Sequence, residues 1–244
     1  MTRFGKNNMT NYDRSLYRLI MKTIYNIYEG ILGDIEDRLE SSNDIKGVIE
    51  EFIDNLYDCS YNISDKPNKD GKYEVSSNGD VKIKKGPGSH NVKSLTNRLF
   101  VWSTVQGDFR IPLMQKIESL DGCPKKVQGT FDIRWTNIKS LKGCPEYVGR
   151  KLMCSYCNYL ETMEYAPNYV GEYICIDSCN TLKSLKGLPD KINGDLYFDD
   201  CPNIKSLDGI SSTIKGSLFC KRCGEKFTKR DIKKRCVVGG KIYN

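Results

Sequence analysis

The chain has 244 residues, of which 39% are hydrophobic and 28% charged, a composition typical of a globular protein with a buried core. No stretch reaches the roughly 18 consecutive apolar residues of a membrane span, and no apolar segment with a cleavage site follows the polar first residues. We therefore expect no membrane partner and a reducing, cytoplasmic compartment. There the eleven cysteines are not expected to form disulfides.

Two helices are predicted near the amino terminus. Residues 13–39 carry apolar side chains at three- and four-residue steps. The same spacing recurs from Ile45 to Leu56, after a cluster of helix N-cap residues at Ser41 to Asp44. We assign residues 1–12 to a disordered terminus and residues 13–62 to a small α-helical region.

Residues 63–91 are assigned to a linker followed by a β-hairpin that caps the next domain. The hairpin is predicted over residues 72–84, where the sequence alternates around Asn78-Gly79. This dipeptide is the strongest short-range signal for a two-residue type I′ turn.

A repeat of about 22 residues dominates the chain from residue 92 to residue 227. Each copy contains a phrase such as "IKSLKGCP" or "LKSLKGLP", whose glycine and proline indicate a turn. Three apolar columns recur at this spacing: Val127, Val148, Val170, Ile192 and Ile214; Phe131, Leu152, Ile174, Leu196 and Leu218; and Ile133, Cys154, Ile176, Phe198 and Cys220. One such unit cannot bury its apolar face alone, so six copies predict a solenoid of stacked coils.

Each coil is expected to contain one short strand, because its second and third apolar columns are separated by a single residue. Stacked coils would then form a parallel sheet on one side, with irregular segments on the other. The corner after each strand leaves buried backbone groups that need a partner. A structural ladder at 22-residue spacing stands at this corner: Cys157, Cys179, Cys201 and Cys223.

The motif "L-x-L-x-x-C-x-x-L", from Leu152 to Leu160, resembles the leucine-rich repeat, in which an asparagine or cysteine ladder occupies this corner. The phrase "SLKGCPEYVG" and the ending "CGEKFTKRDIKKRCVVGGKIY" are more similar to solenoid proteins encoded by large tailed bacteriophages. The resemblance covers roughly residues 92–244. It implies a leucine-rich-repeat-like, right-handed solenoid with a short-stranded parallel β-sheet of about six coils. It also implies a phage origin, with the host cytoplasm or the virion as location, and no particular activity.

Zinc binding and catalysis are the first alternatives to a purely structural role for the cysteines. The pairs Cys154-x-x-Cys157 and Cys220-x-x-Cys223 have the spacing of a metal knuckle. Both members of each pair, however, fall in repeat columns, and the column of Cys154 and Cys220 elsewhere holds Ile176 and Phe198, which cannot bind a metal. The single histidine, and the lack of a phosphate loop or nucleophile motif, argue against an enzyme. We expect no cofactor, no metal and no small-molecule substrate.

The net charge of +7 lies in the last 25 residues, which carry nine basic and two acidic side chains. Thr228 is predicted to cap a short helix over residues 229–236, and residues 228–244 are assigned to this capping helix and a basic tail. The cations available for a polyanion such as nucleic acid are Lys221, Arg222, Lys229, Arg230, Lys233 and Lys234. The alternative is a solvated end cap, which solenoids need.

The outward face of the predicted sheet is the main candidate for a binding site. The residue between each pair of inward strand residues points outward, which gives the column Arg110, Asp132, Met153, Cys175, Tyr197 and Phe219, flanked by Tyr173. The first two coils would expose charge and the last four an apolar stripe, which usually marks an interaction surface. The alternative is that the amino-terminal helices cover the stripe. The sequence thus predicts non-catalytic recognition, with a host or phage protein as the favoured partner.

Overall fold

The computed structural model describes residues 45–84, 95–96 and 99–244. The chain divides into two compact units, Met1–Asn55 and Leu56–Asn244. The segments predicted as a disordered terminus and as a first helix lie outside the described residues. The second predicted helix is confirmed as α3 (Ile45–Leu56), on which Ile49 and Ile53 are buried. No helix in the described ranges is long and apolar enough to cross a membrane.

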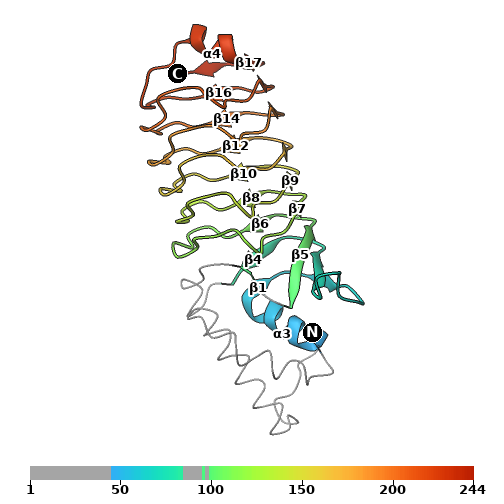
Figure 1. Ribbon diagram of the computed structural model, residues 1–244. Helices are drawn as coiled ribbons and strands as arrows, with labels where there is room; N and C mark the ends of the chain where they lie inside the picture. The colour runs from blue at the N-terminus through green and yellow to red at the C-terminus, as the bar shows by residue number, and fades with distance from the viewer. Residues whose placement is uncertain (1–44, 85–94, 97–98) are drawn as a thin grey trace. The chain divides into compact units, whose positions relative to one another are not determined.

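The second unit is a solenoid of coils of about 22 residues, as predicted (Figure 1). Within the described residues, each coil contributes one short strand to a nine-stranded sheet in the order β1-β4-β6-β8-β10-β12-β14-β16-β18. Its pairs are parallel except β1–β4. The strands of this large sheet are β1 (Tyr57–Asp58), β4 (Val81–Ile83), β6 (Phe109–Arg110), β8 (Phe131–Asp132), β10 (Leu152–Met153), β12 (Ile174–Cys175), β14 (Leu196–Tyr197), β16 (Leu218–Phe219) and β18 (Ile242–Tyr243).

Each coil also carries a second strand, where irregular structure was expected. These strands form a six-stranded sheet and, further along, a three-stranded sheet in the order β13-β15-β17. Five of them, β7, β9, β11, β13 and β15, hold the apolar column that begins at Val127, whose side chains are fully buried. The strands are β2 (Tyr61–Ile63), β3 (Tyr73–Ser77), β5 (Phe100–Val105), β7 (Lys126–Val127), β9 (Tyr147–Val148), β11 (Tyr169–Val170), β13 (Lys191–Ile192), β15 (Thr213–Ile214) and β17 (Val237–Val238).

The hairpin predicted over residues 72–84 is wrong. Its two strands, β3 and β4, belong to different sheets, and each pairs in parallel with the next coil, β3 with β5 and β4 with β6. Asn78 and Gly79 do not have the positive φ that a type I′ turn requires. Instead, Ser77 Oγ accepts a hydrogen bond from the Gly79 amide at 3.1 Å and forms the corner of an additional coil. The solenoid therefore begins before residue 92.

Backbone hydrogen bonds join each coil to both of its neighbours. In the large sheet, the Phe131 amide donates to the Lys151 oxygen of the following coil. On the other side of the coil, the Gly149 amide donates to the Val127 oxygen of the preceding coil. Both sides of each coil are therefore held in register with the next.

The turn in the "SLxGxP" phrase requires a left-handed backbone. Gly122, Gly143, Gly187 and Gly209 take φ values between 82° and 102°. In the third copy, "LETMEYAP" replaces the glycine with Tyr165, which has φ 69° and is 62% exposed. A left-handed conformation costs a non-glycine residue roughly 1–2 kcal/mol. The coil is therefore strained at Tyr165.

The carboxyl-terminal segment contains the predicted helix and then one more coil. Helix α4 spans Lys229–Arg235, with Thr228 as its N-cap, and it buries Ile232. Beyond it, β17 pairs with β15 and β18 pairs with β16, so both sheets continue past the helix. The residues assigned to a basic tail thus contain two strands.

Candidate recognition surface

The outward column of the large sheet holds a continuous apolar stripe at its carboxyl-terminal half. Successive parallel pairs place its members side by side, and all of them are partly exposed. We call this the outer stripe: Met153, Cys175, Tyr197, Phe219 and Tyr243. Sequence analysis missed Tyr243, because helix α4 lengthens its distance from the preceding coil beyond 22 residues.

Three aromatic rings of the outer stripe are stacked along the solenoid. The ring centroids of Tyr197 and Phe219 lie 4.3 Å apart at 10°, and those of Phe219 and Tyr243 lie 4.5 Å apart at 9°. Tyr173 meets Tyr197 edge-on, at 5.6 Å and 71°. Because the stacked rings cover one another's faces, the stripe presents ring edges outward. Such a surface suits packing against apolar side chains better than flat stacking of bases or sugars.

Polar groups hold one ring of the outer stripe and lie beside others. The Tyr197 hydroxyl donates to Asp195 Oδ2 at 2.8 Å. Burial and this bond raise the pKa of Tyr197, so the phenol stays neutral. Lys151 Nζ lies 4.9 Å from the ring centroid of Tyr173, and Lys221 Nζ lies 5.4 Å from that of Tyr243. The outer stripe is thus apolar and is flanked by cations. This arrangement is like the apolar core and polar rim of many protein interfaces.

Of the two charges predicted to be exposed on the first two coils, one is buried. Asp132 is only 1% exposed, because Arg134 covers it and donates to both of its carboxylate oxygens, at 2.9 and 2.7 Å. Arg110 pairs with Asp108 and keeps 37% of its side chain exposed. Of the predicted sheet-face residues, Asp132 is therefore not available to a partner. The accessible part of the predicted column comprises Arg110 and the outer stripe.

Cys175 is the one cysteine of the outer stripe. Its Sγ lies 3.1 Å from Ser155 Oγ and donates to Asp177 Oδ2 at 3.3 Å. Burial raises the pKa of Cys175 to about 11, so the sulfur is a protonated thiol at neutral pH. A thiol in this state is a poor nucleophile, and its contribution to the stripe is apolar.

The cysteine ladder is present and its partners are backbone carbonyls. Each ladder thiol donates at 3.3 Å to a carbonyl oxygen of the preceding coil: Cys157 to Ile133, Cys179 to Cys154, Cys201 to Ile176 and Cys223 to Phe198. Where the ladder begins, Thr136 Oγ1 donates to the Ile133 oxygen at 2.8 Å in its own coil. The ladder therefore satisfies the buried corner carbonyls. No cysteine is in a disulfide, and the described residues contain no cluster of three or more potential metal ligands.

Several of the cations at the carboxyl-terminal end are engaged within the chain. Arg222 donates to both oxygens of Asp200, at 2.5 and 2.6 Å, and Arg235 donates to Asp208 at 2.6 Å. Lys229, Arg230 and Lys233 are exposed on α4 and take part in no ion pair within the described residues. The number of cations available to a ligand at this end is thus smaller than the nine basic residues of the sequence suggest.

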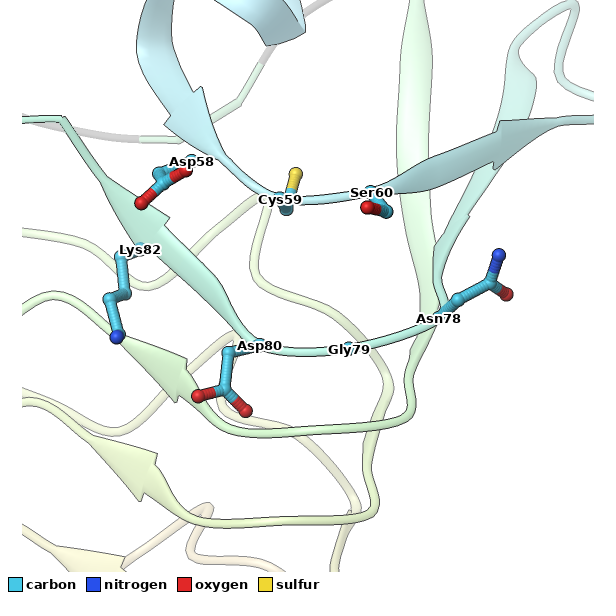
Figure 2. Close-up of a pocket in the computed structure, with 7 residues that line it drawn as sticks. All are labelled: Asp58, Cys59, Ser60, Asn78, Gly79, Asp80 and Lys82. Carbon is cyan, nitrogen blue, oxygen red and sulfur yellow. The ribbon is translucent and has the colours of Figure 1, made fainter.

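A polar depression lies at the other end of the solenoid. Figure 2 shows that its side chains come from the strands β1 and β4 and from the connections β1–β2 and β3–β4, and that they point in different directions rather than toward one centre. It is lined by Asp58, Cys59, Ser60, Asn78, Gly79, Asp80 and Lys82, most of them exposed. Asp80 Oδ1 already accepts a hydrogen bond from the Asp108 amide at 2.9 Å. These side chains therefore do not surround a common point at which a ligand could be held.

A second exposed aromatic group lies at the corner that follows the large sheet. Six residues there, one from each of six successive coils, take a left-handed backbone with φ between 54° and 66°. We call this the corner column: Leu113, Trp135, Tyr156, Ser178, Asp200 and Arg222. Leu113, Trp135 and Tyr156 are 53%, 43% and 39% exposed. Sequence analysis did not identify them, although Trp135 and Tyr156 immediately precede the ladder residues.

No protein-family model matches the chain, and neither a curated protein nor a solved structure gives a significant match.

Proposed function

We propose that this chain is a non-catalytic recognition protein that binds another protein through the outer stripe. The observation that carries the proposal is the row of stacked, edge-exposed rings formed by Tyr197, Phe219 and Tyr243. Aromatic side chains are enriched among the residues that dominate binding energy at protein interfaces. The partner would present aliphatic and aromatic side chains, because ring edges leave no free face for stacking.

Affinity capture with matched variants tests this function. The stripe variant carries Tyr197→Ser, Phe219→Ser and Tyr243→Ser. The control carries Tyr147→Ser and Tyr169→Ser, which removes a stacked pair from the other side of the coil, with centroids 4.8 Å apart. We expect a protein retained by the wild type and the control to be lost from the stripe variant. A photocrosslinking residue at position 153 should then join that protein to the chain.

Circular dichroism of both variants shows whether the solenoid is intact. Retention of every captured protein by a folded stripe variant would contradict the proposal. So would crosslinks from a site on the other sheets with none from position 153.

The biological setting follows from the resemblance of the repeat phrases to solenoid proteins of large tailed phages. In that setting the chain is a leucine-rich-repeat-like binding module, and the partner is a host protein or a virion component. Capture from uninfected host lysate and from purified virions distinguishes the two. A partner found in neither source would count against the phage setting while leaving the stripe proposal to its own test.

Polyanion binding is the second candidate function. It rests on the exposed cations of α4 that have no ion pair among the described residues: Lys229, Arg230 and Lys233. A nucleic acid bound there should shift in a gel at low salt and be released steeply as salt rises. Reversing these three charges together with that of Lys234 should abolish the shift. An unchanged shift in the reversed variant would exclude this end as the contact.

A further inference from the structure

The corner column carries aromatic side chains that the fold does not require. Its left-handed backbone recurs in six successive coils, where glycine or asparagine would be easiest to accommodate. The column instead holds leucine, tryptophan and tyrosine in three neighbouring coils, all of them well exposed. Packing in the core does not explain bulky apolar residues at exposed, strained positions, and such positions often serve binding.

Tyr156 has one ring face covered and one open. The Trp135 and Tyr156 rings are stacked with centroids 3.8 Å apart and planes at 7°. The next member of the column is Ser178, in a coil about 4.8 Å further along. The amide bonds Tyr156 to Asp177 and Ser178 to Asp199, both 2.9 Å, hold these coils in register. A hydroxymethyl group is too short to cover a phenol ring, so a slot remains above Ser178.

Two carboxylates belong to residues that immediately precede members of the corner column, Asp177 before Ser178 and Asp199 before Asp200. Asp177 Oδ1 accepts the Asp199 amide at 2.8 Å and its Oδ2 accepts the Cys175 thiol at 3.3 Å, while Asp199 Oδ1 accepts the Lys221 amide at 2.5 Å. Both carboxylates thus come from the same edge of the sheet as the slot. Burial, together with the like charges of Asp199 and Asp200, raises the pKa of Asp177. Because Arg222 neutralises only Asp200, the region beside the slot has excess negative charge.

We propose that the slot binds an arginine side chain presented by a partner protein, with the guanidinium stacked on Tyr156 and paired with Asp177 and Asp199. A guanidinium is planar, stacks on aromatic faces and forms forked hydrogen bonds with carboxylates, whereas an ammonium is a point charge. The chain contains the same interaction nearby, since Arg222 reaches from its own coil to both oxygens of Asp200 in the preceding one. This site adjoins the outer stripe through the Cys175–Asp177 hydrogen bond, but it uses different residues and does not depend on the function proposed for the stripe.

The test follows the indole N–H signal of Trp135 by NMR while a blocked peptide, acetyl-Gly-Arg-Gly-amide, is added. Trp135 is 43% exposed and Trp102 only 2%, so the two indoles are distinguishable by their response. Matched peptides carry citrulline, which keeps the planar shape without the charge, or lysine, which keeps the charge without the plane. We expect saturable shifts with arginine, at least about fivefold weaker binding with citrulline, and intermediate binding with lysine.

Variants locate the site. Tyr156→Ser and Asp199→Asn should each weaken arginine binding at least about fivefold. Ser178→Leu should block the slot without removing either partner, and the column already holds leucine at position 113. Tyr169→Ser on the other side of the coil, and Tyr197→Ser in the outer stripe, should leave binding unchanged. Equal binding of arginine and citrulline peptides, shifts that do not saturate, or full binding by folded Ser178→Leu would each overturn the proposal.

Discussion

The cysteines at the solenoid corner act as hydrogen-bond donors to backbone carbonyls. In the described coils, Cys179 is buried and donates to the Cys154 carbonyl of the preceding coil, and burial raises the pKa of its thiol. Thr136 makes a comparable bond with its hydroxyl where the ladder begins. This position therefore requires a small side chain with a protonated hydrogen-bond donor. The 22-residue spacing of the cysteines allowed the position to be recognised in the sequence.

Replacement of Cys179 by threonine and by valine separates the hydrogen bond from the packing. The two side chains have nearly the same shape, but valine leaves the Cys154 carbonyl without its donor. We expect the valine variant to be less stable than the threonine variant by roughly 1–3 kcal/mol in urea unfolding. Equal stability of the two would show that the thiol serves only to fill space.

Asp177 gives the chain a predicted pH dependence. Its raised pKa, caused by burial first and by its carboxylate neighbours, means that ionisation is easier in the unfolded chain. Its contribution to stability is therefore full at acid pH and is lost as pH rises through the folded pKa. Asp177→Asn keeps the Oδ1 acceptor for the Asp199 amide and removes the charge. The variant should melt at a higher temperature than the wild type at pH 7, and at a similar temperature at pH 3. A lower melting temperature at pH 7 would contradict this account.

At the scale of elements, the strands that follow directly from the 22-residue period were predictable from the sequence. The elements that depend on which strand pairs with which were not. The large sheet followed from the alternating columns around Leu196, but the second sheet did not. Its two-residue strands, such as β7 with Val127, contribute a single buried residue each in most coils, and one residue shows no alternation. The hairpin failed because the Asn78-Gly79 signal is local, whereas β3 and β4 each pair with a strand of the following coil.

The glycine turn provides a test at the same scale. Tyr165→Gly should stabilise the chain by about 1 kcal/mol, because it removes a left-handed non-glycine residue whose side chain is 62% exposed. In the next copy, Gly187→Ala should destabilise it by roughly 2 kcal/mol or more, since an added Cβ would lie 2.2 Å from the Met163 oxygen. Urea unfolding measures both. A destabilised Tyr165→Gly variant would show that the tyrosine ring contributes more than its backbone costs.

At the scale of the whole solenoid, each coil contacts only its neighbours, so damage should stay local. Removing residues 237–244 deletes the acceptors of the Leu218 and Cys220 amides, which are the Lys241 and Tyr243 carbonyls. We expect hydrogen exchange at these two amides to accelerate more than about tenfold, while the Phe131 amide changes less than about twofold. Uniform acceleration along the chain would mean that the coils unfold as one cooperative unit.

The candidate binding surfaces were only partly predictable at this scale. The sequence places Tyr197 and Phe219 on one face because they share a repeat position, and this register is seen. The stacking of Trp135 on Tyr156 depends on where the corner directs two strained residues, which no alternation of apolar positions encodes. The burial of Asp132 likewise depends on Arg134 folding back over it.

The pairing of the coils through parallel sheets has an electrical consequence. Within a sheet, successive peptide groups point toward opposite neighbouring strands, so each sheet has only a small net dipole along the solenoid. Unlike an α-helix, the stack of coils therefore ends without a partial charge that nearby ions must offset. The cations on α4 are not needed to balance the sheets of the solenoid. Lys229, Arg230 and Lys233, which have no ion pair among the described residues, present their charge to the solvent and to any ligand that approaches.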